Sequence, residues 1–209
     1  KQTTKNVPIT RRDIQPMAAL EFTTNTQTPV EQVDNRITYT TKNNEEFIFR
    51  YGKPFDANIT AHYYDNSTQK FIIECDAPIK VINDKAFRRL VGDVSLTSVS
   101  LPSQLETIGE YAFHFNDLQE LVIPGSVTMI KDHAFRENRL KRLTFLCGDE
   151  DLEIRDCDNI SPAESNGAFR EAFFDYIYID RNIRFKDDLG GEYAYVDDMS
   201  MFAHSGDGT

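Results

Sequence analysis

The feature that most constrains the fold is a motif that returns every 22 residues. Leu118–Phe135 reads Leu-Gln-Glu-Leu-Val-Ile-Pro-Gly-Ser-Val-Thr-Met-Ile-Lys-Asp-His-Ala-Phe, and Leu96–Phe113 has apolar residues in the same positions. The next copy begins at Leu140. A fixed period of this length, with apolar residues in constant phase, is typical of a stacked solenoid. Because solenoids present broad exposed surfaces, the pattern favours binding rather than chemistry.

Each repeat contains two segments that should face inward. Leu121 and Ile123 alternate with outward residues, which predicts a strand with one buried face. Pro124 ends this strand, because proline cannot donate to a ladder. A second inward segment and a short helical turn that closes the coil should follow, marked by Val127, Ile130 and Ala134-Phe135.

Two kinds of residue recur in phase and are expected to be structural. A phenylalanine follows an alanine in each copy and should fill the space between neighbouring coils, and these residues are Phe87, Phe113, Phe135 and Phe169. Losing such a buried phenylalanine should cost about 3–5 kcal/mol. Asn116 and Asn138 lie 22 residues apart and should satisfy backbone groups of the adjacent coil.

The chain divides into three regions by composition. Residues 1–33 are rich in Thr, Gln and Asn and are expected to be a tether or linker. Residues 34–76 predict a β module that caps the solenoid, because an open end would expose core. Its two expected hairpins pair Ile37–Thr40 with Glu46–Arg50, and Ile59–Tyr64 with Lys70–Glu74.

Residues 77–209 are expected to form the solenoid itself, with about four coils. An acidic insert occupies 146–166, and a C-terminal cap should end in an edge strand near Tyr193–Val196. The expected fold class is therefore mainly β with short helical turns, a solenoid with an N-terminal β cap.

Charge and hydropathy limit the partners. The chain has 34 acidic and 23 basic residues and a formal net charge of -11, so nucleic acid is not an expected partner. No apolar run approaches the roughly 18–20 residues of a membrane span. Since the chain begins at Lys1 rather than Met, we expect a mature or trimmed form, which would meet a membrane only through a lipid anchor absent from this chain.

The residues that could carry chemistry do not form a recognisable site. Cys147 and Cys157 flank one loop and could form a disulfide, or all three cysteines, Cys75 included, could be small buried side chains. The sequence contains no CxxC pair that could bind zinc through thiolates, and no two of its histidines lie three or four residues apart. We therefore expect no metal, no cofactor and no catalytic residues.

The insert is the most acidic segment. Seven carboxylates lie between Asp149 and Glu164, and clustered carboxylates can bind calcium. The spacing lacks the glycine and terminal glutamate of an EF-hand, so a solvated acidic loop is the favoured interpretation. Paired acids for glycoside hydrolysis need a deep cleft, which a narrow solenoid rarely provides.

The outward strand positions form two columns, Ser98, Glu120, Arg142, Tyr176 and Ser100, Val122, Thr144, Tyr178. Tyrosine and arginine are frequent at binding hot spots, so these columns are the candidate ligand-binding face. The residues predicted to bind are Glu120, Arg142, Thr144, Tyr176 and Tyr178. The alternative is an ordinary exposed sheet in which tyrosine is favoured by its β-propensity.

The pattern Leu-x-x-Leu-x-Ile-Pro-x-Ser-Val-x-x-Ile-x-x-x-Ala-Phe resembles the BspA-type leucine-rich repeats of bacterial surface proteins. The resemblance covers roughly residues 36–183 and is strongest in 94–145. Two features depart from the family, because Asn116 and Asn138 stand where cysteine is common and the insert 146–166 is unusual.

The resemblance implies an exported protein, secreted or lipid-anchored, at the bacterial cell surface or outer membrane. It also implies adhesion to a host extracellular protein or to a glycan. Three alternatives remain at this point: a glycan-capturing surface lipoprotein, an enzyme accessory domain, and a structural spacer.

Overall fold

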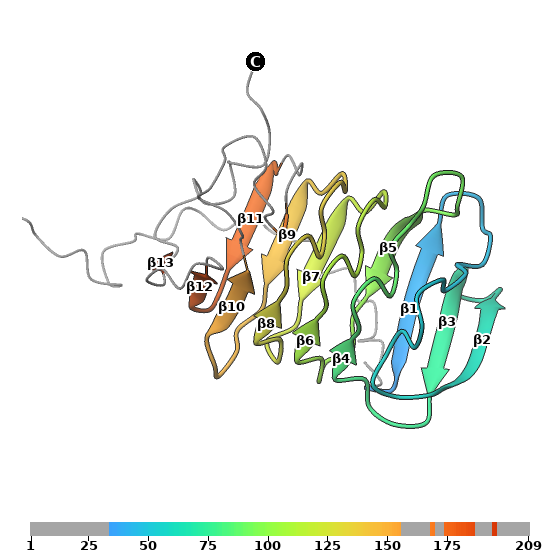
Figure 1. The fold of residues 1–209 in the computed structure, drawn as a ribbon, viewed down its shortest axis with the longest axis horizontal. Coiled ribbons are helices and arrows are strands. Elements are labelled where there is room, and N and C mark those ends of the chain that lie inside the picture. Colours follow the sequence, from blue (N-terminus) through green and yellow to red (C-terminus); the bar gives the residue numbers. More distant parts are fainter. Residues whose placement is uncertain (1–33, 156–167, 170–173, 187–193, 196–209) are drawn as a thin grey trace, which may run out of the picture. The chain divides into compact units, whose positions relative to one another are not determined.

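The computed structural model describes residues 34–155, 168–169, 174–186 and 194–195. These residues form β-strands and turns and contain no helix, so none that could cross a membrane (Figure 1). The mainly β prediction is therefore confirmed for this part of the chain. The strands are β1 Arg36–Thr41, β2 Ile59–Asp65, β3 Lys70–Cys75, β4 Val81–Ile82, β5 Leu96–Ser100, β6 Thr107–Ile108, β7 Glu120–Ile123, β8 Met129–Ile130, β9 Arg142–Phe145, β10 Leu152–Arg155, β11 Tyr176–Ile179, β12 Ile183–Lys186 and β13 Ala194–Tyr195.

The strands form three sheets whose registers follow the sequence period. One is antiparallel, with the order β2-β3-β1-β5. A second runs β13-β12-β10-β8-β6-β4 and is parallel except for β13, which pairs antiparallel with β12. The third, β11-β9-β7, is parallel and pairs Leu121 with Leu143 (Figure 1). Residues one period apart thus become neighbours in a ladder, and β13 lies within the edge strand predicted at Tyr193–Val196.

The N-terminal module contains one of the two predicted hairpins. β2 and β3 pair antiparallel, from Ile59 opposite Cys75 to Asp65 opposite Lys70. The turn between them is held by Asp65, whose carboxylate accepts the Ser67 backbone N–H at 2.9 Å. This hairpin is confirmed.

The other hairpin prediction is wrong. Residues 46–50 form no strand, and β1 pairs instead with β3 and β5. The reason is tertiary packing: Phe47 and Phe49 lie with ring centroids 5.5 and 5.3 Å from Phe87. The Phe47 N–H donates to the buried hydroxyl of Tyr39 at 3.1 Å, so this backbone group is satisfied without a partner strand.

The core of the repeats contains a stack of phenylalanines. The rings of Phe87, Phe113, Phe135 and Phe169 lie one above another, with successive centroids 5.1, 5.1 and 5.3 Å apart and interplanar angles of 8°, 3° and 7°. All four side chains are buried. Their separation is close to the spacing of strands in a sheet, so one ring per repeat fills the interior without a void.

The turns that carry these phenylalanines are not helical, which corrects the expected short helical turns. The residue before each of the first three Ala-Phe pairs has a positive φ, 63° at Lys85, 55° at Tyr111 and 55° at His133. The Phe113 N–H donates to Ala134 O at 2.7 Å, on the next repeat. The flanking Ala112 and His114 N–H groups bond back to Gly109 O and Tyr111 O. Because only alternate N–H groups bond along the chain, the turns do not continue into a helix.

A buried asparagine closes each of two turns. The Asn116 side-chain amide donates to Phe87 O at 2.8 Å and Phe113 O at 3.0 Å, and its oxygen accepts the Leu96 N–H at 2.9 Å. Asn138 makes the equivalent bonds one repeat later. Each amide thus satisfies backbone groups of two neighbouring repeats, which lets the turn be buried.

Candidate binding surface

The parallel sheet β7-β9-β11 brings the predicted binding residues together. Its register places Glu120 beside Arg142 and Arg142 beside Tyr176. Two positions along the strands, it places Val122 beside Thr144 and Thr144 beside Tyr178. These six residues point away from the core, since their strand neighbours Leu121, Ile123, Leu143 and Phe145 are buried. We call their outward side the tyrosine face.

The tyrosine face exposes large apolar groups. Tyr176 is 52% exposed, Tyr178 45% and Val122 49%. Within the described residues, neither tyrosine hydroxyl makes a hydrogen bond or ion pair. Beside them, Arg142 and Glu120 form an ion pair across the ladder (Figure 1 shows the three strands side by side). The face therefore combines apolar surface and unused hydroxyls with a charged pair at its β7 side.

The predicted columns are shorter than the sequence suggested, because Ser98 and Ser100 belong to another sheet. β5 pairs antiparallel with β1, with Ser98 opposite Thr40 and Ser100 opposite Thr38. The Ser98 hydroxyl lies 2.6 Å from the Thr40 hydroxyl. Alternation within a strand predicts which side chains point outward, but it does not say which strand lies alongside.

A polar groove of about 700 Å³ runs along a different corner of the repeats. It crosses three successive turns that follow β5, β7 and β9, and it was not predicted from the sequence. Its lining residues are Ser103, Gln104, Glu106, Gly125, Ser126, Thr128, Cys147, Gly148, Asp149 and Glu150. The 22-residue phase of these positions was visible, but the residue types differ from turn to turn and gave no sign of a groove.

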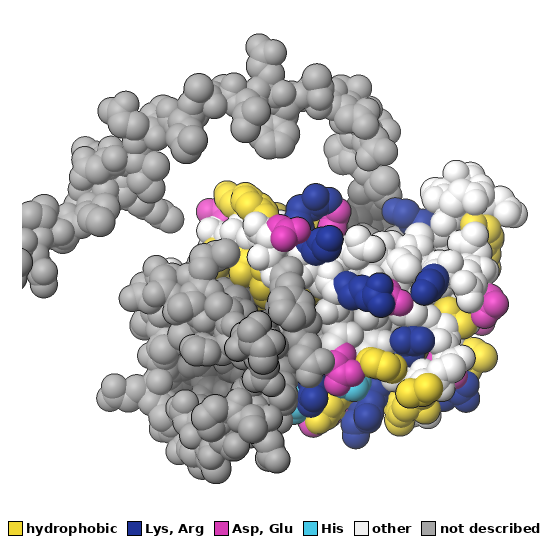
Figure 2. All heavy atoms as spheres, turned by 90° about the horizontal axis from the view of Figure 1, so that it is seen from above, with side chains coloured by type: hydrophobic (Ala, Val, Ile, Leu, Met, Phe, Trp, Pro, Cys, Tyr) yellow, Lys and Arg dark blue, Asp and Glu magenta, His cyan; other side chains and the backbone are white. Residues whose placement is uncertain are grey.

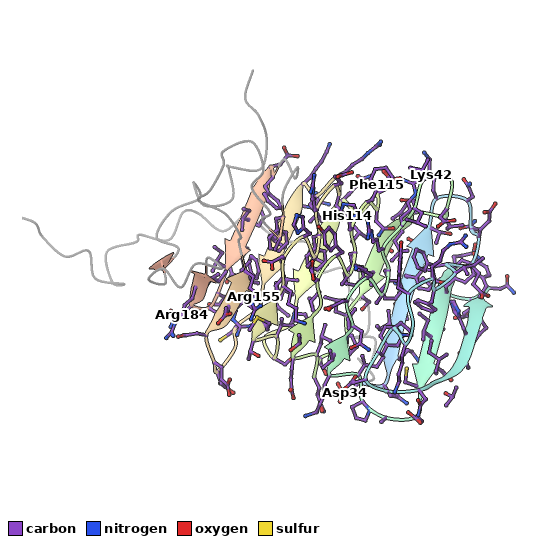
Figure 3. All side chains as sticks on the ribbon, in the orientation of Figure 1. Asp34, Lys42, His114, Phe115, Arg155 and Arg184 are labelled. Carbon is purple, nitrogen blue, oxygen red and sulfur yellow. The ribbon has the colours of Figure 1, made fainter. Side chains whose placement is uncertain are left out.

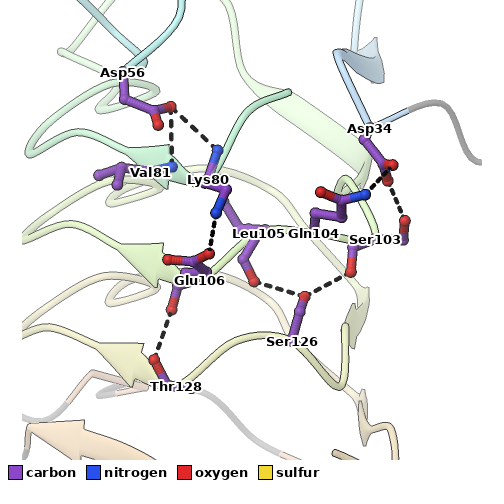
Figure 4. A network of polar contacts seen from close by, with 10 residues as sticks. All are labelled: Asp34, Asp56, Lys80, Val81, Ser103, Gln104, Leu105, Glu106, Ser126 and Thr128. Atoms are coloured by element: carbon purple, nitrogen blue, oxygen red, sulfur yellow. Dashed lines mark hydrogen bonds and ion pairs between the residues drawn. The ribbon is translucent and has the colours of Figure 1, made fainter. Parts of the chain in front are cut away.

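Internal contacts occupy much of the groove lining, as Figure 4 shows. The Ser126 hydroxyl lies 2.6 Å from Ser103 O and 2.7 Å from Leu105 O. Asp34 accepts the Gln104 side-chain amide at 2.6 Å. The turns also pack closely, since a Cβ on Gly125 would overlap Cys147 O. These contacts give the groove a structural role in joining the repeats.

The cysteines and the acidic insert are only partly described. Cys147 is exposed and Cys157 lies outside the described residues, so their pairing stays a prediction. Cys75 is buried, and this burial raises the pKa of its thiol to about 11. Within the described ranges no three His, Cys, Asp or Glu side chains gather to hold a metal, while Asp156, Asp158 and Glu164 of the insert lie outside those ranges.

Three histidines are placed by packing. The His62 Nε2 atom lies 2.6 Å from the Tyr39 hydroxyl, and His133 stacks on Tyr111 with centroids 4.3 Å apart. Burial, and then the charges of Arg88 and Arg136, lowers the pKa of His114 to about 4. His204 lies outside the described residues.

Comparison with known proteins gives one match. Residues 57–155 match the BspA type Leucine rich repeat region, in six copies. Searches of curated proteins and of solved structures gave no match. Repeats of this family are associated with surface and adhesion-like bacterial proteins and are typically non-enzymatic interaction domains. The matched region contains both buried asparagines and the first three phenylalanines of the stack, and residues 57–155 of this chain are a BspA-type leucine-rich repeat region.

Proposed function

We propose that this protein is a non-enzymatic cell-surface binding protein that adheres to a host extracellular protein or glycan through the tyrosine face. The observation that carries the proposal is the pair Tyr176 and Tyr178, which project from one side of β11 and are each about half exposed. Tyrosine offers a rigid ring and a polar hydroxyl, a combination that is enriched at interfaces.

The layout of the tyrosine face supports this proposal. Neighbouring strands lie about 4.8 Å apart, so Tyr178, Thr144 and Val122 follow one another across the sheet at side-chain contact distance. Tyr176 lies in the adjacent row with the Glu120–Arg142 pair, whose side chains are both well exposed. An apolar centre beside an exposed charged pair has the composition expected of an interface core with a polar rim.

We also infer the architecture that presents this face. The parallel ladders support a solenoid of about four coils formed by residues 77–209, including the C-terminal cap, because they join residues one period apart. The module 34–76 would cap its N-terminal end, and the pairing of β1 with β5 supports this. Residues 1–33 would be a tether, and the family association supports export to the bacterial surface or outer membrane.

The test is a binding measurement with matched variants. The purified chain is titrated against a panel of host matrix proteins and glycans by surface plasmon resonance, together with the double variant Tyr176→Ala/Tyr178→Ala. The control is Tyr63→Ala, because Tyr63 on β2 is 42% exposed and lies in the N-terminal module. We expect saturable binding by the unmodified chain. The affinity should fall at least tenfold in the double variant and stay unchanged in the control.

The other outcomes separate the alternatives. Binding that both variants retain would move the site off the tyrosine face and contradict the proposal. Saturable capture of oligosaccharides alone would favour a glycan-capturing lipoprotein, and turnover of glycans or peptides would favour an enzyme accessory domain. No binding to any member of the panel would favour a structural spacer.

A further inference from the structure

Two adjacent arginines lie on aromatic rings at the turns that carry the phenylalanine stack. The Arg88 guanidinium lies over the Tyr111 ring, 5.0 Å from its centroid, and 5.8 Å from the centroid of Tyr51. Arg89 lies over Phe115, also 5.0 Å from the centroid. Stacking on a ring holds the plane of a guanidinium in place. The Nε of Arg88 is buried and the Nε of Arg89 is bonded to Asp93 O, so the terminal amino groups are the ones that could bind a ligand.

Neither arginine forms an ion pair with a described residue. No carboxylate of the described ranges lies within ion-pair distance of Arg88 or Arg89. Arg89 donates to the backbone oxygen of Asp93 at 3.0 Å, while the carboxylate of Asp93 accepts two bonds from Arg50, at 2.6 and 3.0 Å. The Asp93 carboxylate, which also interacts electrostatically with Arg89, is thus bonded directly to a different arginine.

The equivalent positions of the next two repeats add one further cation. Positions 88, 114 and 136 are equivalent in the repeat, and they hold Arg88, His114 and Arg136. Arg88 and Arg136 are both close enough to His114 to lower its pKa, after burial, to about 4, so the histidine is neutral at neutral pH. Glu137 lies 3.4 Å from both His114 and Arg136, and it offsets one of the charges.

The cluster of Arg88, Arg89 and Arg136, with Tyr111, His114 and Phe115 beneath them, is called here the arginine surface. It is net positive in a chain whose formal charge is -11. Figure 3 shows His114 and Phe115 on the side of the repeats opposite Asp34, away from the polar groove. Figure 2 looks onto that side, and Lys and Arg side chains are spread over its described part.

We propose that the arginine surface binds the sulfate or carboxylate groups of a linear anionic polysaccharide. Arginine forks match such groups with two parallel hydrogen bonds. Arg136 lies two repeat spacings beyond Arg88, about 10 Å, so a polymer with spaced anions can contact the Arg88–Arg89 pair and Arg136 together. At physiological salt the Debye length is about 8 Å, so a thin chain is attracted locally, whereas a folded acidic partner would approach the acidic remainder of the protein.

The site is independent of the tyrosine face, and the two proposals can fail separately. Binding is measured by calorimetry with heparin as the probe, with neutral dextran and poly-glutamate as comparison ligands. The variant Arg88→Gln/Arg89→Gln removes the stacked pair. The control Lys80→Gln/Lys131→Gln removes the same charge from exposed lysines paired with Glu106 and Asp84.

We expect heparin affinity to fall at least tenfold in the arginine variant and less than twofold in the control. Binding should weaken steeply with added salt, and dextran should not bind. The Tyr176→Ala/Tyr178→Ala variant should bind heparin as the unmodified chain does. If the arginine variant is unstable by thermal unfolding, Arg88→Lys/Arg89→Lys keeps the charge and should lose part of the affinity, because lysine cannot form the stacked fork.

Three results would overturn the proposal. The first is an equal loss of affinity in the arginine variant and the lysine control, since that would reflect net charge alone. The second is an absence of heparin binding to the unmodified chain. The third is poly-glutamate binding as tight as heparin binding, which would assign the surface to acidic proteins.

Discussion

Buried and exposed positions of the repeats follow the same 22-residue period, but the residue type is kept from repeat to repeat only at the buried positions. Inside, a phenylalanine recurs in all four described copies and stacks at almost constant distance. Outside, equivalent positions of β7, β9 and β11 hold Glu120, Arg142 and Tyr176. Close packing in the interior requires the same residue type in every repeat. An exposed position has no such packing constraint, so its residue type can vary with the ligand that it binds.

The sharpest test of this difference is Phe113→Ala against Thr144→Ala. Phe113 is fully buried between two parallel rings, so its truncation should lower the free energy of unfolding by about 3–5 kcal/mol. Thr144 lies on the tyrosine face, where truncation should change stability by less than about 0.5 kcal/mol. Urea unfolding followed by circular dichroism measures both, and equal effects would contradict the contrast between inside and outside.

The buried asparagines extend the test from apolar to polar interior groups. Replacement of Asn116 by Ala leaves Phe87 O, Phe113 O and the Leu96 N–H without their side-chain partner. We expect a loss of about 2–3 kcal/mol by urea unfolding, because buried unsatisfied groups keep their desolvation cost. Asn182→Ala is the control, since the side chain of Asn182 is exposed and, among the described residues, is bonded to Asp151 alone. A loss in Asn116→Ala no larger than in the control would mean that water replaces the amide.

The half-buried His114 should make the free energy of unfolding depend on pH. Its pKa is lowered to about 4 by burial first, so the unfolded chain takes up the proton before the folded one does. The stabilisation is complete above about pH 6.5 and is lost as the pH falls toward 4. Thermal unfolding between pH 7 and pH 4.5 should show His114→Gln losing about 1 kcal/mol less than the unmodified chain. An identical pH profile would exclude a role for this histidine.

The smallest expected effect belongs to the Glu120–Arg142 pair on the outside. Both side chains are well exposed, so solvent screens their attraction. A double-mutant cycle with Glu120→Ala and Arg142→Ala should give a coupling energy of about 0.2–1 kcal/mol in low salt and less in 1 M salt. A coupling above about 2 kcal/mol would show that this pair is part of the folded framework.

The same contrast explains what the sequence could predict. The inward residues of β7 and the second segment at Val127 and Ile130 were predicted correctly, because burial repeats their residue types. The segment 46–50 alternates like a strand, yet its phenylalanines pack against Phe87, and local alternation cannot distinguish the two arrangements. The turns were mistaken for helical ones because the positive φ of Tyr111 and His133 is adopted without glycine.

The candidate sites were predictable to different degrees. Alternation correctly placed Tyr176 and Tyr178 on one side of a strand, since both follow directly from period two. The arginine surface was not predicted, because Arg88 and Arg89 lie on rings from the following repeat, at Tyr111 and Phe115. Equivalent positions of the repeats hold chemically different residues there, so the 22-residue period, which identifies the buried residues, does not identify this cluster.

The tight corner at Gly125 has a consequence for engineering this chain. A Cβ there would collide with Cys147 O, so the backbones of the turns after β7 and β9 pack too closely at this corner for a larger residue. In the loop that follows Phe87, by contrast, a Cβ added at Gly92 would meet no heavy atom within 4 Å, and Val91 beside it is 90% exposed. A peptide tag or a foreign epitope should therefore be grafted at Val91–Gly92, where the added residues would extend into solvent and leave the stacking of the repeats unchanged.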